Sequence, residues 1–292
     1  MKKILTIIAA VLISSSIFAQ RPQGPQIPEM YGISKMTFRV SSPEVAEEFY
    51  GDYLGFDHAF DYESIYGPVL VYKINDRQFL EFLVVDQNVA ELGNYISMTI
   101  QTPDVEAMHK HIKSNGYEVT DIVVDGAGNK VFTTVDDYGK LIEFADMNSS
   151  TLHAKSEGKF LSERRISTQM LHSGLHRNES DEFPKFWREV LGFKEFIRFP
   201  EDRDQHFNLL YLYMPGSTEV VEATYTVGAA PEANWEHPCL STYDMQETTD
   251  ILRERDPSIR VNPHVGRTKR FLISVKNVDG TKVEFSEPFS TR

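Results

Sequence analysis

The sequence has very little cysteine, because Cys239 is the only one among its 292 residues. A single thiol cannot form a disulfide within the chain, and it cannot supply the paired cysteines of a cysteine-based zinc site. Any metal that this chain binds must therefore be held by histidine and carboxylate side chains.

Clustered positive charge is also lacking. The chain has 30 Lys and Arg against 43 Asp and Glu, which gives a formal net charge of -13. Nucleic acids and anionic membranes are bound through groups of basic side chains, so this acidity argues against both as main partners. The composition, 41% hydrophobic and 25% charged, is that of an ordinary globular protein. The length predicts two domains.

The N-terminal apolar run is too short to cross a membrane. Two lysines precede apolar and small residues from Ile4 to Phe18, and Ala19-Gln20 is a plausible cleavage point. A membrane span needs about 20 apolar residues, so this pattern is typical of a secretory signal peptide rather than of an anchor. We expect residues 1–19 to be removed, a polar Pro-rich lead-in at 20–32, and a periplasmic or secreted protein without stable membrane insertion.

The rest of the chain repeats one pattern four times. Strand-like segments begin at residues 33, 95, 172 and 237, and each is followed by a helix and then by further strand-like runs. Leu54-Gly55-Phe56 ends the first of these helices, and Leu191-Gly192-Phe193 ends the third. The two Phe residues follow Lys35 and His172, respectively, by the same 21 positions. The second half of the chain is therefore a copy of the first.

These modules and helix ends resemble the vicinal oxygen chelate superfamily, which includes glyoxalase I, extradiol dioxygenases and fosfomycin-resistance proteins. The resemblance covers nearly all of residues 33–288. It implies an α+β fold in which four βαβββ modules pair into two half-open barrel domains. We place these domains at residues 33–146 and 167–288, with a polar linker at 147–166 between them.

The resemblance also implies where a metal would be bound, because its ligands come from the first and last strands of each module. In the C-terminal half the matching residues are His172, Glu222, His237 and Glu284; in the N-terminal half they are Lys35, Glu81, Tyr95 and Glu143. Two imidazoles and two carboxylates suit a divalent ion, which could be nickel, cobalt, zinc, manganese or ferrous iron.

The N-terminal set has different chemistry. Lys35 is a poor metal ligand because it must first lose its proton, and Tyr95 stands where the other half has an imidazole. We expect a degenerate site, in which the Lys35 ammonium group lies between Glu81 and Glu143 as a built-in cation.

Strand periodicity adds further candidates near the C-terminal site. Residues two apart on a strand share a face, so His176 should point the same way as His172, and Cys239 the same way as His237. We expect His176 to carry protons and Cys239 to be a small core residue. Tyr211 and His264 are candidates for the wall of the substrate pocket.

Two reactions of the superfamily fit this set. In extradiol dioxygenases two histidines and one glutamate hold ferrous iron, and the matching residues here are His172, His237 and Glu284. However, Ser274 stands where that signature has a catalytic tyrosine, and Glu222 would be a fourth ligand.

The full set resembles glyoxalase I more closely, in which a ligand carboxylate moves a proton between adjacent carbons of the chelated substrate. Glu284 is the first candidate for that role and Glu222 the second. We therefore expect a metal-dependent lyase or isomerase that acts on a small oxygenated molecule, as a monomer or homodimer. A ring-cleaving dioxygenase and a non-catalytic ligand- or metal-binding protein are the alternatives.

Overall fold

The computed structural model describes residues 26–178, 184–202, 204–226 and 235–288. The expected signal peptide at 1–19 and the first part of the lead-in lie outside the described residues. Among the helices of the described part, none is long and apolar enough to span a membrane.

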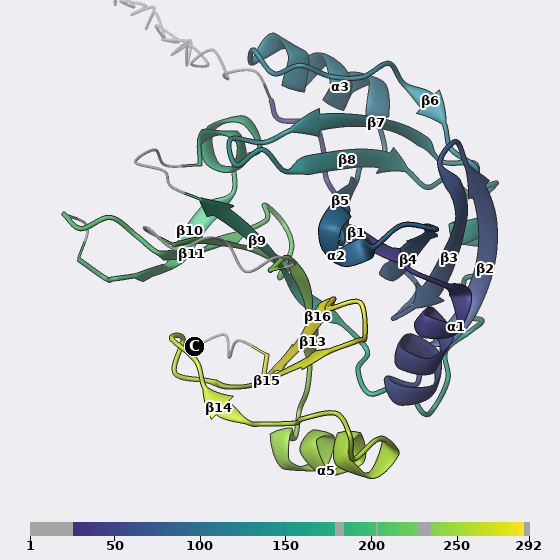
Figure 1. The fold of residues 1–292 in the computed structure, drawn as a ribbon. Coiled ribbons are helices and arrows are strands. Elements are labelled where there is room, and N and C mark those ends of the chain that lie inside the picture. The colour runs from purple at the N-terminus through teal and green to yellow at the C-terminus, as the bar shows by residue number, and fades with distance from the viewer. Residues whose placement is uncertain (1–25, 179–183, 203, 227–234, 289–292) are drawn as a thin grey trace, which may run out of the picture.

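Two eight-stranded sheets dominate the fold, and the helices are few and short (Figure 1). The strands of the first sheet are β1(Gly32–Val40), β2(Asp57–Ser64), β3(Gly67–Lys73), β4(Phe79–Val84), β5(Tyr95–Gln101), β6(Val123–Val124), β7(Lys130–Val135) and β8(Leu141–Asp146). Those of the second sheet are β9(Met170–Asn178), β10(Lys194–Phe199), β11(Leu209–Tyr213), β12(Val220–Thr226), β13(His237–Ser241), β14(His264–Val265), β15(Phe271–Lys276) and β16(Lys282–Ser286).

The two sheets have the same topology. The strand order is β2-β3-β4-β1-β5-β8-β7-β6 in the first sheet and β10-β11-β12-β9-β13-β16-β15-β14 in the second. Each strand of the first order corresponds to the strand eight labels later in the second. The α+β fold of duplicated, half-open barrels is therefore confirmed. The domain boundaries at 146 and 167 stay a prediction.

Polar side chains cap the two longest helices among the described residues. The helical segments are α1(Pro43–Ala46), the π-helical η1(Glu47–Tyr53), α2(Val89–Leu92), α3(Val105–Ser114), α4(Leu152–Lys155), the π-helical η2(Phe186–Val190) and α5(Met245–Arg255). The Asp104 carboxylate caps α3 by accepting a hydrogen bond from the Ala107 N–H at 2.8 Å. The Asp244 carboxylate caps α5 by accepting one from the Glu247 N–H at 2.9 Å. These caps satisfy amides that have no partner within the helix.

Each sheet curls until its two edges approach each other. In the first half, a Cβ added to Gly126 would lie 2.0 Å from the carbonyl oxygen of Glu63. Gly126 follows β6 and Glu63 lies in β2, which are the two edge strands. In the second half, Nη1 of Arg267, which follows the edge strand β14, donates at 2.8 Å to Oδ1 of Asn208 in the connection between β10 and β11. The concave face of each sheet thus becomes the wall of a half-open barrel.

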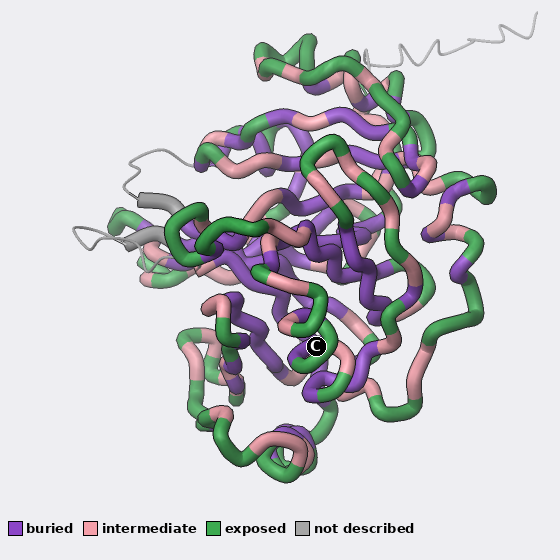
Figure 2. Tube along the Cα trace, turned by 45° about the vertical axis from the view of Figure 1, so that its right-hand side comes forward, coloured by how far each residue is buried: buried purple, intermediate pink, exposed green. Residues whose placement is uncertain are grey.

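Alternate residues of each strand face opposite sides of the sheet. In β4, Leu80 and Phe82 join the main core, whereas Phe79 and Leu83 belong to a smaller cluster on the other face. The main core contains residues of both halves, and buried segments follow the strands through the interior (Figure 2). Packing of the convex faces therefore leaves the concave faces free to carry polar groups.

Candidate metal centre

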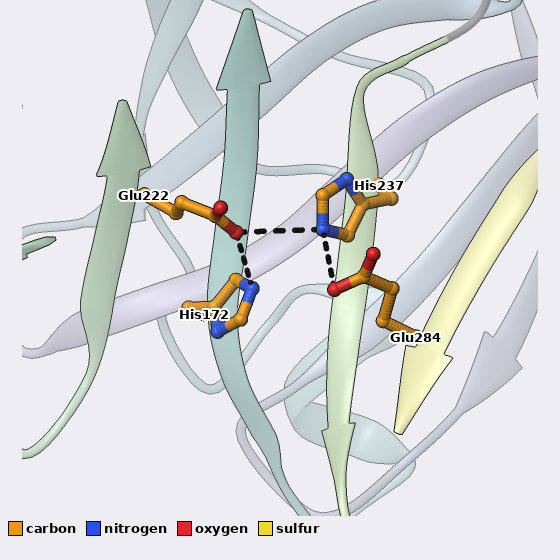
Figure 3. A group of neighbouring side chains, drawn as sticks. All are labelled: His172, Glu222, His237 and Glu284. Atoms are coloured by element: carbon orange, nitrogen blue, oxygen red, sulfur yellow. Dashed lines mark ion pairs between the residues drawn. The ribbon is translucent and has the colours of Figure 1, made fainter. Parts of the chain in front are cut away.

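The four polar residues expected in the C-terminal half come together on the concave face of the second sheet. Glu222, His172, His237 and Glu284 belong to β12, β9, β13 and β16, which are consecutive in the strand order (Figure 3). One nitrogen or oxygen atom from each lies within 4.8 Å of the others. The strand registers explain this convergence, because residues at matched positions of neighbouring strands share one face.

The contacts among these atoms are close without being good hydrogen bonds. Nε2 of His172 lies 2.8 Å from Oε2 of Glu222, and Nε2 of His237 lies 3.1 Å from Oε2 of Glu284. Nevertheless, among the described residues neither imidazole Nε2 nor Oε2 of Glu222 has a hydrogen-bond partner of acceptable geometry. Buried polar atoms normally have such partners. Lone pairs that converge on a shared point are what a bound cation would satisfy.

Neighbouring groups hold two of these side chains in the form that binds metals. Nδ1 of His237 lies 2.9 Å from the carbonyl oxygen of Trp235, to which it can only donate, so the lone pair of the neutral imidazole is on Nε2. Oε1 of Glu284 accepts from Nζ of Lys282 at 2.9 Å and from Oγ of Ser274 at 3.2 Å. Such outer contacts orient a ligand and fix its tautomer.

Both carboxylates are ionised at neutral pH. Burial opposes the charge of Glu222, but His172 and His237 outweigh it and hold the pKa of this carboxyl at about 2. Burial also opposes the charge of Glu284, and His237 and Lys282 keep its pKa well below the usual value. The residues present therefore fit a divalent ion, with two imidazoles and two carboxylates as its ligands.

A glycine makes room for one of the imidazoles. Gly174 lies opposite His237 in the register of β9 and β13, and opposite Glu222 in the register of β9 and β12. A Cβ on Gly174 would lie 2.2 Å from Cε1 of His237. Atoms cannot approach that closely, so any larger residue at this position would push the imidazole away from the other three groups.

A cavity of about 340 Å³ lies over the cluster, and both carboxylates line it. Tyr211 and His264, the expected wall residues, line it as well. The Tyr211 ring makes an edge contact with the His172 ring at 5.3 Å between centroids, whereas His264 is exposed at the rim.

The other two candidates are buried. His176 packs against the Trp235 ring, with centroids 5.3 Å apart. Cys239 is fully buried between His172 and Glu284 in the strand register, and burial raises the pKa of its thiol well above the usual value. A thiol kept in its neutral form is a poor ligand. The position therefore agrees with a small core residue.

In the first half, the expected cation lies between two carboxylates. Nζ of Lys35 is 2.9 Å from Oε2 of Glu81 and 3.2 Å from Oε1 of Glu143. Burial alone would lower the pKa of Lys35, but the carboxylates of Glu143 and Glu81 outweigh it and raise the pKa. The ammonium group is therefore charged, and it occupies the place that corresponds to the metal cluster of the second half.

The expectation for Tyr95 is wrong by two residues. In the second sheet, Cys239 pairs with His172, and His237 pairs with Gly174. In the first sheet, the matching pairs are Thr99 with Lys35 and Ser97 with Thr37. The counterpart of His237 is therefore Ser97. The hydroxyl of Tyr95 instead donates to the carbonyl oxygen of Leu141 at 2.9 Å.

Three side chains that take part in these clusters escaped the sequence analysis. His153 lies in the segment expected to be a linker, yet its Nε2 is 3.0 Å from Oε1 of Glu81. Tyr62 donates to the other oxygen of Glu81 at 3.0 Å. Lys282 is two residues before Glu284 on one strand, so the alternation rule that indicated His176 could have found it.

Comparisons with known proteins agree with this fold. The model of the Glyoxalase/Bleomycin resistance protein/Dioxygenase superfamily matches residues 32–144. A comparison with curated protein sequences found no match.

Solved structures resemble the whole chain at low sequence identity. The 2,3-dioxygenase LapB from Pseudomonas sp. KL28 has 16% identity and a TM-score of 0.69, covering 90% of this chain and 93% of its own. The Mn(II)-bound glyoxalase from Novosphingobium aromaticivorans has 15% identity and a TM-score of 0.67, covering 89% and 83%. Homoprotocatechuate 2,3-dioxygenase from Brevibacterium fuscum has 15% identity and a TM-score of 0.65, covering 89% and 81%. At these identities the likeness concerns the fold.

Proposed function

Since residues 32–144 match the model of the Glyoxalase/Bleomycin resistance protein/Dioxygenase superfamily, and about nine tenths of the chain share the fold of a solved glyoxalase and of dioxygenases, we propose that the protein is a metal-dependent lyase or isomerase. Its substrate would be a small oxygenated molecule bound in the cavity over His172, Glu222, His237 and Glu284. The convergence of two imidazoles with two ionised carboxylates carries this proposal. Manganese is one candidate ion, besides nickel, cobalt, zinc and ferrous iron.

A bound divalent ion would polarise a substrate oxygen and stabilise the negative charge that develops when a carbon-bound proton leaves. Glu222 and Glu284 both line the cavity and both are ionised, so either can accept that proton. Glu284 is the first candidate because Nζ of Lys282 lies 2.9 Å from its Oε1. This ammonium group would steady the carboxylate while its other oxygen faces His237.

The fourth ligand favours proton transfer over ring cleavage. In a dioxygenase site, only His172, His237 and Glu284 would hold the iron. The other coordination positions of the iron would be left to the substrate and dioxygen. Here Oε2 of Glu222 lies 2.8 Å from Nε2 of His172 and 3.6 Å from Nε2 of His237, inside the same cluster. Ser274, at the position of the expected tyrosine, donates to Glu284.

Ring cleavage by ferrous iron remains the second candidate, because dioxygenases are among the solved structures that share the fold over about nine tenths of the chain. A protein that binds a ligand or metal without turnover is the third. Two measurements separate the three: oxygen uptake with catechols under ferrous iron, and exchange of a carbon-bound proton for deuterium in small hydroxy-carbonyl compounds under manganese, nickel, cobalt or zinc.

The decisive variants are Glu284→Gln and Glu222→Gln, which keep the shape of each side chain and remove its charge. We expect Glu284→Gln to lower proton exchange by about 100-fold or more while some metal binding persists. Oxygen uptake with catechols and no proton exchange would overturn the proposal in favour of the dioxygenase. Stoichiometric metal with neither activity would favour the binding protein.

The export of the protein is part of the proposal and rests on residues 1–19. The mature protein would begin at Gln20, outside the cytosol. N-terminal sequencing of the protein from a periplasmic or culture-medium fraction tests this. A chain that starts at Met1 and stays with the cytosolic fraction would contradict it.

A further inference from the structure

The first half contains a larger cavity than the candidate metal centre does. Its volume is about 750 Å³, against about 340 Å³ over the metal cluster. Sites for small molecules usually have volumes of about 300–1,000 Å³. Ser97 contributes to this difference, because it stands where the second half carries the His237 imidazole. The loss of that ring leaves room on the concave face of the first sheet.

Apolar side chains form most of the wall. Val69 and Leu83 from β3 and β4 line one side, and Val131 from β7 lines the other. At the mouth, Ile65 and Val124 are 91% and 67% exposed, although both are large apolar residues. Exposed apolar groups around a concave site indicate a surface that an apolar ligand could cover.

The polar base of the cavity carries excess negative charge. Glu81 is saturated, since it accepts from Lys35, Thr37, Tyr62 and His153. Glu143 is not: both of its contacts, from Lys35 and from Oγ1 of Thr99, use Oε1. Within the described part of the chain, Oε2 of Glu143 accepts no hydrogen bond.

Charge around the rest of the cavity has the same sign. Among the described residues that line it, Lys35 is the only Lys or Arg, and five are acidic: Glu63, Glu81, Asp121, Asp125 and Glu143. Burial raises the pKa of Glu143, and Lys35 offsets this effect only in part. One more positive charge near Oε2 would therefore be stabilising.

We infer that this cavity is a second small-molecule site, distinct from the metal centre, and that it takes an apolar amine in its protonated form. The ammonium group would donate to Oε2 of Glu143, and the apolar body would lie between Val69, Leu83 and Val131. The acidic lining disfavours carboxylates and phosphates. This site does not depend on the reaction proposed for the second half.

Calorimetric titration with three probes of one shape tests this inference: 4-phenylbutylamine, 4-phenylbutanol and 4-phenylbutyrate. The protein is the full mature chain, as wild type and as His172→Ala/His237→Ala, so that binding of an amine to a metal can be recognised. We expect the amine to bind at least about tenfold more tightly than the alcohol, the acid to bind weakest, and the amine affinity to survive in the double variant.

Two variants locate the site. Glu143→Gln should abolish the preference for the amine over the alcohol. Because this buried substitution could disturb folding, Val124→Lys is the second variant: it lies at the exposed mouth, adds a positive charge, and should weaken amine binding several-fold. Glu106→Gln, an exposed carboxylate outside the cavity, is the matched control and should change nothing.

Three results would overturn the inference. The first is no saturable binding of the amine at millimolar concentration. The second is equal affinity for all three probes. The third is amine binding that Glu143→Gln and Val124→Lys leave unchanged, or that the His172→Ala/His237→Ala variant loses, since the amine would then lie elsewhere.

Discussion

Gly174 and His237 face each other across β9 and β13, and a Cβ on residue 174 would lie 2.2 Å from Cε1 of the imidazole. The first half has the opposite arrangement at the same place, where Thr37 faces Ser97. In the second half, the small residue Gly174 on β9 faces the His237 imidazole on β13. In the first half, the larger residue Thr37 on β1 faces Ser97 on β5, which has no imidazole. The two halves differ by paired exchanges of this kind within one framework.

Substitution of Gly174 by alanine should remove His237 from the metal cluster. We expect the metal affinity of Gly174→Ala to fall about tenfold or more, with little loss of folded structure, because the clash is local. Competition with a chromogenic chelator measures the affinity. Gly51→Ala is the matched control, since its Cβ would meet only the flexible end of the Glu47 side chain. Equal metal affinity in both variants would show that His237 is not a ligand.

Removal of the metal should lower the thermal stability of the protein. A ligand that binds only the folded state stabilises it by about 2.7 kcal/mol when its concentration is 100 times its dissociation constant. We expect manganese to raise the melting temperature of chelator-treated wild type, and one ion to bind per chain. His172→Ala/His237→Ala should show neither effect. A second stoichiometric ion that remains in the double variant would contradict the role given to Lys35.

Lys35→Met should be strongly destabilising, because it leaves Glu81 and Glu143 in the interior without their shared cation. Removing one partner of a buried ion pair typically lowers the free energy of unfolding by about 3–5 kcal/mol. The control is Lys130→Met, which breaks an exposed pair with Glu106 and should change this free energy far less, because solvent screens that pair. Urea denaturation of both variants provides the comparison. Similar losses would mean that the buried cation contributes no more than a surface one.

The contact between the halves at Glu219 should make stability depend on pH. Glu219 accepts from the backbone N–H of Ile33 at 2.5 Å and from the side chain of Gln78 at 3.1 Å, and burial raises the pKa of its carboxyl to about 7. The folded state therefore binds this proton more tightly than the unfolded state. The stability that the proton provides is full below about pH 4.5 and is lost as the pH rises to about 7.

Glu219→Gln should remove this part of the pH dependence. The difference between the two pKa values corresponds to about 3 kcal/mol at most. Melting temperatures of wild type and variant between about pH 4.5 and pH 8 measure this contribution. The slope of melting temperature against pH is compared rather than its absolute value, because glutamine replaces one acceptor oxygen with a donor and so changes the stability by itself. Parallel curves for the two proteins would refute the assignment.

Much of the framework could be predicted from the sequence, because it depends on local periodicity. Asp104 and Asp244 are of a residue type that favours helix starts, and both cap helices. The equal spacing of Lys35 and His172 from their helix ends indicated the duplication, and both residues occupy matched positions on β1 and β9. Such patterns reflect interactions between residues a few positions apart.

The error at Tyr95 has a different origin. The pairing of β1 with β5 shifts its register between Thr37 and Phe38, so Tyr95 pairs with Phe38 and does not continue the alternation that Thr99 and Ser97 follow. A one-residue irregularity in a ladder changes which residues face each other, and it leaves no mark in residue type or spacing.

The sequence by itself determined the duplicated framework and the residue types that could bind a metal, since both depend on periodicity and on side-chain chemistry. Only the tertiary structure decided which groups meet. His153 reaches Glu81 across 72 positions, and the Gly174 backbone makes room for a ring 63 residues further along the chain. Contacts of this kind arise when segments that are distant in the chain come together in the folded protein, and no local pattern encodes the distance between them.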